Sequence, residues 1–118
     1  MSRSLQVARN FESGQKHATA TAGANTNAVL TIAAEADEIH VLDMLWFSYT
    51  DGTAGASPVG RITISIGGTV VFDHDITSSG PGPLRLHGMN GGKANEEVVV
   101  TLYAGGADVV GKLSVQYW

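Results

Sequence analysis

The stretch Gly106-Ala107-Asp108-Val109-Val110-Gly111-Lys112 comes nearest, in spacing, to a motif that does chemistry. Its two glycines and its lysine have the spacing of a phosphate-binding loop, whose backbone amides and lysine hold the phosphates of a nucleotide. However, Leu113 stands where a serine or threonine would reach magnesium. An alternating strand pattern also follows, in place of the helix whose N-terminus binds phosphate. We therefore expect a turn here and no nucleotide site.

Asp73, His74 and Asp75 are the best-placed candidates for metal ligands. Successive residues of a strand point to opposite faces, so the two carboxylates would share one face and the imidazole would lie on the other. The three side chains cannot converge on one ion from a regular strand. The remaining histidines fall in separate segments of the chain, at His17, His40 and His87. We expect neither a metal site nor a cofactor.

Covalent and acid-base catalysis find little support in the residue types. The chain has no cysteine, and Gly55-Ala56-Ser57-Pro58-Val59 lacks the last glycine of a nucleophile elbow. Acidic residues cluster only at 35–38 and at Glu96-Glu97. Such clusters are usually solvated, although two loops could bring carboxylates together in any fold. We therefore expect a protein that is not an enzyme.

Charge and hydropathy patterning exclude two classes of partner. Seven Lys and Arg stand against eleven Asp and Glu, for a net charge of −4, and the basic residues are scattered along the chain. They form no cationic stripe of the kind that a phosphate backbone requires. Nowhere do eighteen apolar residues follow one another, and the start lacks the apolar run of a signal peptide. We expect no nucleic acid partner, no membrane and no export.

The elements that would position a site are short strands. Charged residues make up only 15% of the chain while glycine reaches 15 residues, a balance typical of strands joined by tight turns. Period-two alternation between turn signals predicts about eight strands, in an all-β, single antiparallel β-sandwich that is jelly-roll-like. The sandwich covers residues 16–118, after an extended N-terminal arm, 1–15. The expected strands are 17–22, 28–33, 39–49, 61–66 with a hairpin partner, 84–87, 97–103 and 109–118.

The hairpin after Arg61–Ile66 has two conceivable registers. A three-residue loop, Gly67 to Thr69, sets Ile66 against Val70 and Ile64 against Phe72. A two-residue loop would mix polar with apolar partners. Because register follows the apolar pattern, we predict the three-residue loop. The proline-containing stretch 78–83 is predicted to be a loop, since proline cannot donate to a central ladder.

Segment 39–49 is apolar on both of its alternating faces. One face suffices for the core of a sandwich, so the other must be covered by a loop or by another subunit. Trp46 and Trp118 are the large aromatic anchors of the chain; they either pack internally or lie in an interface. The candidate interface residues are those of the second face, the terminal tryptophan and the apolar residues of the arm: Leu42, Met44, Trp46, Trp118, Leu5, Val7 and Phe11.

Four stretches carry a resemblance to a known class of proteins. They are residues 60–76 (GRITISIGGTVVFDHDI), 83–86 (PLRL), 94–106 (ANEEVVVTLYAGG) and 111–117 (GKLSVQY). Together they resemble small β-sandwich capsid decoration, or cement, proteins of tailed bacteriophages. The resemblance implies a non-enzymatic virion protein, made in the host cytoplasm, that binds the major capsid protein at the capsid surface and stabilises the shell as a homotrimer. It supplies no functional motif to carry over.

The rival hypothesis is a carbohydrate- or receptor-binding β-sandwich of a phage tail tip or fibre. In that case the loops 51–58, 78–83 and 88–95 would form a site with Asn90, Asn95 and Trp118. Saturable sugar binding would distinguish this module from a decoration protein.

Overall fold

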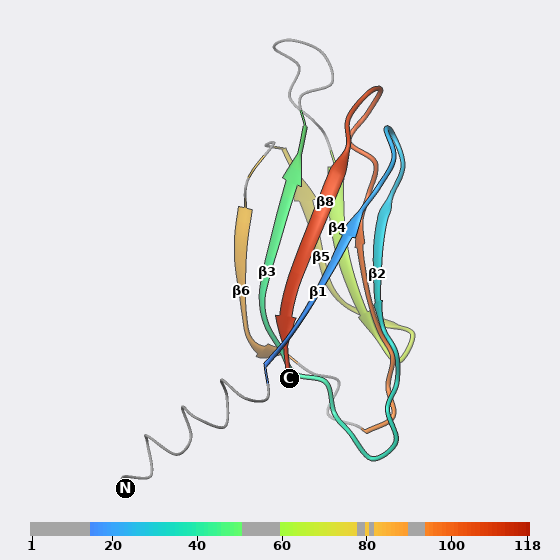
Figure 1. The fold of residues 1–118 in the computed structure, drawn as a ribbon, viewed down its shortest axis with the longest axis vertical. Coiled ribbons are helices and arrows are strands. Elements are labelled where there is room, and N and C mark those ends of the chain that lie inside the picture. The colour runs from blue at the N-terminus through green and yellow to red at the C-terminus, as the bar shows by residue number, and fades with distance from the viewer. Residues whose placement is uncertain (1–14, 51–59, 78–79, 81, 90–93) are drawn as a thin grey trace, which may run out of the picture.

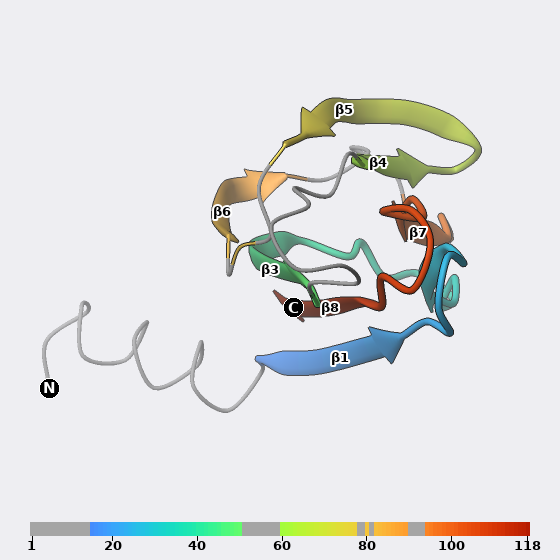
Figure 2. The same ribbon diagram turned by 90° about the horizontal axis from the view of Figure 1, so that it is seen from above.

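Eight strands form two antiparallel sheets of four strands each, packed face to face (Figures 1 and 2). The computed structural model describes residues 15–50, 60–77, 80, 82–89 and 94–118. Sheet A has the order β1 (Lys16–Thr21), β8 (Gly111–Tyr117), β3 (Leu42–Tyr49) and β6 (Gly82–Met89). Sheet B has the order β2 (Ala28–Ile32), β7 (Val98–Leu102), β4 (Gly60–Ile66) and β5 (Thr69–Ile76). The predicted all-β antiparallel sandwich is confirmed.

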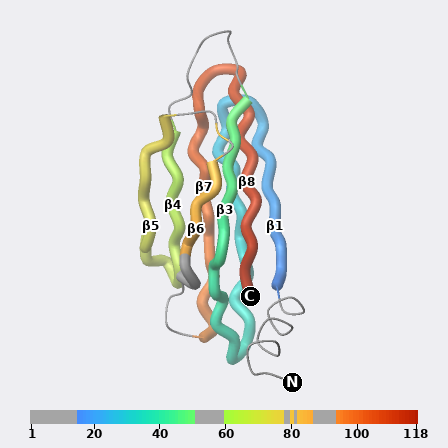
Figure 3. Tube along the Cα trace, turned by 90° about the vertical axis from the view of Figure 1, so that its left-hand side faces the viewer, coloured from blue at the N-terminus to red at the C-terminus, as the bar shows by residue number. Residues whose placement is uncertain are grey.

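The chain changes sheet at almost every connection. Only the β4–β5 hairpin stays within one sheet, and every other pair of consecutive strands is divided between sheets A and B. Figure 3 shows the result, with β4 and β5 on one side of the molecule and β8 and β1 on the other. Because partners in a sheet are distant in sequence, the packed core is needed to hold each sheet together.

Among the residues that the structure describes, no helix is long and apolar enough to cross a membrane.

The core lies between the sheets and follows the alternation of the strands. β2 and β7 show the regular pattern, with buried residues at every second position. Full burial of one leucine, isoleucine or valine stabilises the fold by about 1.5–3 kcal/mol relative to exposure. The largest of the almost wholly inaccessible side chains are Leu42, Leu45, Ile62, Ile64, Val98, Val100, Leu102, Leu113 and Val115.

The β4–β5 hairpin has the predicted pairing but not the predicted loop. Ile64 faces Phe72, as expected, whereas Ile66 pairs with Thr69 rather than Val70. The turn is therefore the two-residue Gly67-Gly68, with φ of 60° and 84°. Both values suit the turn type that matches strand twist in short hairpins. A β-bulge, seen as a register shift between Ile64 and Ser65, brings Ile64 opposite Phe72 despite the shorter turn. The bulge therefore supplies the extra residue that we had placed in a longer loop.

Two further expectations about strands are corrected. Leu42 was placed on the same face as Met44 and Trp46, but a register shift between Leu42 and Met44 turns Leu42 into the core, where it is 0% exposed. β6 begins at Gly82, so Pro83 belongs to a strand and not to the loop. β6 is an edge strand, where a missing backbone donor is tolerated.

Tyr49 closes one end of the core. Its hydroxyl donates a hydrogen bond of 2.8 Å to the backbone carbonyl of Tyr103. Burial raises the pKa of the Tyr49 phenol to about 12. A Cβ at Gly60 would lie 1.9 Å from the Tyr49 hydroxyl oxygen, so this strand position requires glycine.

Candidate functional site

The outer face of sheet A gathers side chains from all four of its strands into regular rows. In the central row, Thr19, Ser114, Trp46 and Pro83 pair successively across β1, β8, β3 and β6. One flanking row contains His17, Gln116, Met44 and Arg85, and the other contains Thr21, Lys112 and Ser48. We call the surface formed by these three rows the Trp46 face.

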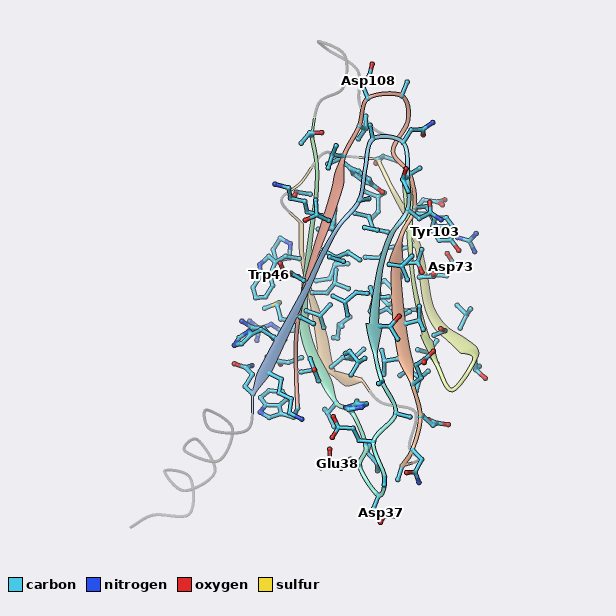
Figure 4. The ribbon with its side chains drawn as sticks, turned by 45° about the vertical axis from the view of Figure 1, so that its right-hand side comes forward. Asp37, Glu38, Trp46, Asp73, Tyr103 and Asp108 are labelled. Carbon is cyan, nitrogen blue, oxygen red and sulfur yellow. The ribbon has the colours of Figure 1, made fainter. Side chains whose placement is uncertain are left out.

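Trp46 occupies the middle of this face. Its side chain is partly exposed and lies on the outside of sheet A in Figure 4. Hydroxyl groups of Ser114 and Thr19 follow on one side and the apolar ring of Pro83 on the other. A flat aromatic ring with a negative π face, next to groups that donate and accept hydrogen bonds, can hold a ligand with one C–H-rich face and polar edges. Sugar rings have that character.

Two cations flank Trp46 on the same face. Lys112 and Arg85 are both exposed. Among the residues that the structure describes, the salt bridges are Lys16–Glu35 and Arg61–Asp73, and neither involves these two side chains. The Trp46 face therefore carries positive charge that its own neighbours leave uncompensated.

The outer face of sheet B has a different composition. Across β2, β7, β4 and β5, one row consists of Thr31, Val99, Ser65 and Val70, and the next of Val29, Thr101, Thr63 and Asp73. We call the surface formed by these two rows the valine–threonine face. Val29 and Val70 are 53% and 57% exposed. Neither of these two rows has an aromatic ring, and Asp73 is their one charged side chain; the next pair, Arg61 and Asp75, adds charge at the border of the face. The two rows themselves offer few specific contacts to a polar ligand.

The charge at the border of the valine–threonine face is neutralised within the protein. Arg61 Nε donates to Asp73 Oδ1 at 2.7 Å, and a second guanidinium nitrogen donates to Oδ2. The same guanidinium lies 5.3 Å from the centre of the Tyr103 ring. The hydrogen bond from Arg61 holds the pKa of the Asp73 carboxyl below its usual value. Figure 4 shows Asp73 and Tyr103 together on the side of the molecule away from Trp46.

A cleft of about 450 Å³ opens between the edge strands β5 and β6. Phe47, Phe72 and Leu84 line it together with His74, whose ring lies 4.4 Å from that of Phe72. A Cβ at Gly82 would come within 2.1 Å of the Phe47 ring, so the aromatic floor of the cleft rests directly on the β6 backbone. The cleft is an apolar gap at the open side of the sandwich.

The candidate metal ligands Asp73, His74 and Asp75 do not converge on one point. Asp73 is engaged by Arg61, and His74 faces the cleft instead. His40 is buried, with its Nε2 2.8 Å from the Ala33 carbonyl and its ring edge-on to Tyr117, so its role is structural. Within the described ranges no group of three or more His, Cys, Asp or Glu side chains could share an ion.

The acidic turn near the start of β3 forms a small polar cluster. A hydrogen bond with Glu35 raises the pKa of Glu38, and the same bond, with help from Lys16, lowers the pKa of Glu35. The Asn95 side-chain oxygen accepts a hydrogen bond from the Asp37 amide at 2.9 Å. These contacts brace the turn and leave Asn95 occupied as a structural residue.

The predicted interface residues are divided among different places. Met44 and Trp46 share the Trp46 face, whereas Leu42 is in the core. Trp118 extends the ladder beyond β8, where its amide donates to the Val41 carbonyl at 2.9 Å. The arm residues Leu5, Val7 and Phe11 lie outside the described part of the chain.

Sequence reasoning missed the partners that surround Trp46. Ser114 and Gln116 alternate with apolar residues in the predicted strand 109–118, but alternation alone does not say which strands are neighbours. Nothing in the sequence marks Arg85 as a neighbour of Trp46. The strand predicted around it, 84–87, is short, and its position beside Met44 depends on the β3–β6 register.

The strand ends that border the loops of the rival hypothesis lie at two ends of the sandwich. The loop after β6 leaves from Met89, which pairs with Leu42 at the start of β3, while the loop before β6 enters at Gly82, which pairs with Phe47 near its end. These loops therefore start from opposite ends of the sandwich (Figure 1). Asn90, and residues 51–58 as a whole, lie outside the described residues.

The Gly106–Lys112 segment is a turn, as predicted. It leads directly into β8 at Gly111, and Gly106 has a φ of 119°. Since a strand follows, there is no helix N-terminus to receive a phosphate.

No family model matches this chain, and no curated protein matches its sequence. Among solved structures, it is similar to a carbohydrate-binding module CBM36 in complex with calcium and xylotriose. The identity is 13% and the TM-score 0.50, over 83% of this chain and 78% of that one. It is also similar to the CBM36-1 domain of a multidomain xylanase from the hindgut metagenome of Trinervitermes trinervoides. That match has 13% identity and a TM-score of 0.50, over 86% and 95% of the two chains. At these identities the likeness establishes a shared β-sandwich fold.

Proposed function

We propose that this protein is a non-enzymatic binding module that recognises carbohydrate through the Trp46 face. The observation that carries the proposal is the position of Trp46, partly exposed in the central row of the outer face of sheet A, between the hydroxyl of Ser114 and the ring of Pro83. An exposed tryptophan on the outside of a sheet contributes little to the core, whereas it is a strong anchor in a binding site. The CBM36 structures provide a fold-level precedent for sugar binding by such a sandwich.

The face suits an extended ligand better than a single compact one. Its rows cross four strands on an open surface, and its polar groups come from all four of them. A sugar ring stacked on Trp46 would leave its hydroxyl groups directed sideways, toward Ser114, Thr19 and the amide of Gln116. Each such hydrogen bond adds specificity at a modest net free energy of about 0.5–1.5 kcal/mol.

A glycan array with purified protein tests the proposal. We expect saturable binding to at least one class of glycan and a loss of about 30-fold in affinity for Trp46→Ala, as for an anchor residue of a binding site. Val29→Ala, which shortens an exposed side chain on the opposite face, is the matched control and should bind normally. Circular dichroism checks that both variants are folded. Equal affinity of wild type and Trp46→Ala would refute the proposal.

A second candidate function is supported by the valine–threonine face. Val29 and Val70 are exposed on a surface with little charge, which favours burial against another protein. This observation supports the capsid decoration protein that the sequence resembles, a homotrimer that binds the major capsid protein on the virion.

Light scattering of the purified protein tests this second candidate. A decoration protein that trimerises through the valine–threonine face should have a mass near three chains and should fall to one chain in Val29→Lys, because a lysine there would be desolvated. Ser114→Lys is the control substitution, on the outer face of sheet A. A monomer that shows no attachment to phage capsids would argue against this function.

A further inference from the structure

We infer that the glycan bound by the Trp46 face is anionic and that it lies diagonally across sheet A, between Lys112 and Arg85. This inference rests on the proposed function and adds to it the chemical class and the direction of the ligand. It depends on the distribution of charge between the two sheets and on the pairing register.

The charge of sheet A is opposite in sign to that of the whole protein. The four strands of sheet A contain Lys16, Arg85 and Lys112 against a single carboxylate, Asp43. The chain as a whole has a net charge of −4. Three cations against one carboxylate give the strands of sheet A a formal charge of +2, so the sheet that displays the partly exposed Trp46 is positive within an acidic protein.

Only two of these cations belong to the face itself. Lys16 pairs with Tyr117 at the edge and forms a salt bridge of 3.8 Å with Glu35. Asp43 lies where the register shifts at the start of β3, outside the rows of the Trp46 face. Lys112 and Arg85 are exposed and have no acidic partner among the described residues. His17 is the remaining titratable group in these rows.

The register places the two cations symmetrically about Trp46. Lys112 is opposite Ser48 on β8, and Arg85 is opposite Met44 on β6, so each is one strand away from Trp46 and two residues along, in opposite directions. With a strand spacing of about 4.8 Å and a rise of about 3.3 Å per residue, each Cα lies roughly 8 Å from that of Trp46, and the pair spans roughly 16 Å. That distance suits a chain of several sugars and exceeds a monosaccharide.

The chemistry of the three side chains then specifies the ligand class. The indole ring takes the C–H face of a central sugar. The Arg85 guanidinium can bind a carboxylate or a sulfate through two parallel hydrogen bonds, and the Lys112 ammonium adds a second point charge. A neutral glycan would leave both cations unused, and an anionic peptide would leave the stacking surface unused.

Calorimetric titration with three probes tests the inference: an oligogalacturonate, a sulfated oligosaccharide and a neutral oligosaccharide of matched length. We expect the wild type to bind one of the two anionic probes at least about tenfold more tightly than the neutral one, with affinity that falls as salt is added. The preferred anionic probe distinguishes a carboxylate from a sulfate ligand. The double substitution Lys112→Gln with Arg85→Gln should lose this preference and keep its affinity for the neutral probe.

The matched control is Arg61→Gln, which removes a cation from the border of the opposite face and should leave the preference unchanged. If neutral and anionic probes bind equally well, and binding still requires Trp46, the inference is overturned while the proposed function stands. If none of the three probes binds although the glycan array shows another ligand, the inference is overturned and the proposed function stands. If Trp46→Ala binds its glycan like the wild type, the proposed function fails as well. Polyglutamate, titrated in the same way, is the control for general charge attraction. If it binds as tightly as the preferred anionic oligosaccharide, the inference is overturned.

Discussion

The two outer faces of this sandwich are built from the same number of strands and yet present opposite surfaces. The Trp46 face combines an aromatic ring, hydroxyl and amide groups and two uncompensated cations, whereas the valine–threonine face is composed mainly of the β-branched residues valine and threonine. Both faces lie over the same core and need only outward-pointing side chains that suit a strand. The contrast teaches that the core determines the fold and leaves each outer face free to acquire its own function.

The two faces differ in whether their charged side chains are paired within the protein. At the border of the valine–threonine face, the Arg61 guanidinium is satisfied by the Asp73 carboxylate and by the Tyr103 ring. On the Trp46 face, Lys112 and Arg85 remain exposed. A neutralised charge stabilises local structure modestly, while an exposed and uncompensated one is available to a ligand.

The largest effect is expected from a pair of adjacent substitutions in β3. Leu45 is 0% exposed in the core and Trp46 is on the outside. Leu45→Ala should lower the free energy of unfolding by about 2–5 kcal/mol, because it leaves a cavity. Trp46→Ala should cost clearly less, about 1 kcal/mol, while it weakens glycan binding about 30-fold. Urea unfolding measures both. A larger loss of stability for Trp46→Ala than for Leu45→Ala would mean that Trp46 is a core residue.

An intermediate effect is expected where sheet A approaches sheet B. In Gly82→Ala, the new methyl group would collide with the Phe47 ring and push it into the cleft between β5 and β6. Overpacking of this kind costs about 1–3 kcal/mol, which thermal unfolding can detect. The Trp46 face should bind glycan as before, because Gly82 belongs to the inner side of β6. A loss of binding without a loss of stability would instead indicate that the cleft is the ligand site.

The smallest effect concerns the ion pair at the border of sheet B. Because the folded-state pKa of Asp73 is depressed, its contribution to stability is present above the unfolded-state pKa and is lost as the pH falls through the folded-state value. Arg61→Gln should raise the pKa of Asp73, which NMR titration measures directly. The melting temperatures of wild type and variant should differ slightly at neutral pH and converge in acid. A difference that grows on acidification would contradict this account.

Much of the fold follows from local pattern. Alternation and turn residues predicted the strands and the antiparallel sandwich, and the pairing of Ile64 with Phe72 followed from matching apolar residues. Two of the errors come from register shifts, and a third comes from β6, which begins at Gly82 inside the predicted loop. A bulge near Leu42 and another after Ile64 change which face a residue occupies, and nothing in the residue types marks either position.

The candidate site was harder to predict than the fold. Trp46 and Met44 were recognised because both sides of their segment are apolar. Their neighbours Ser114 and Arg85 come from strands far away in the sequence, and only the order β8-β3-β6 brings them together. Period-two alternation describes a strand by itself and contains no information about the strand beside it.

The most direct test of the central claim is an NMR map of backbone amide shifts during titration with the glycan that binds best. We predict that the shifts concentrate on residues of the Trp46 face, such as Met44, Trp46 and Ser114, and leave Val29 and Val99 unchanged. Shifts confined to the valine–threonine face, or to Phe72 and His74 in the cleft, would contradict the assignment of the Trp46 face as the binding site.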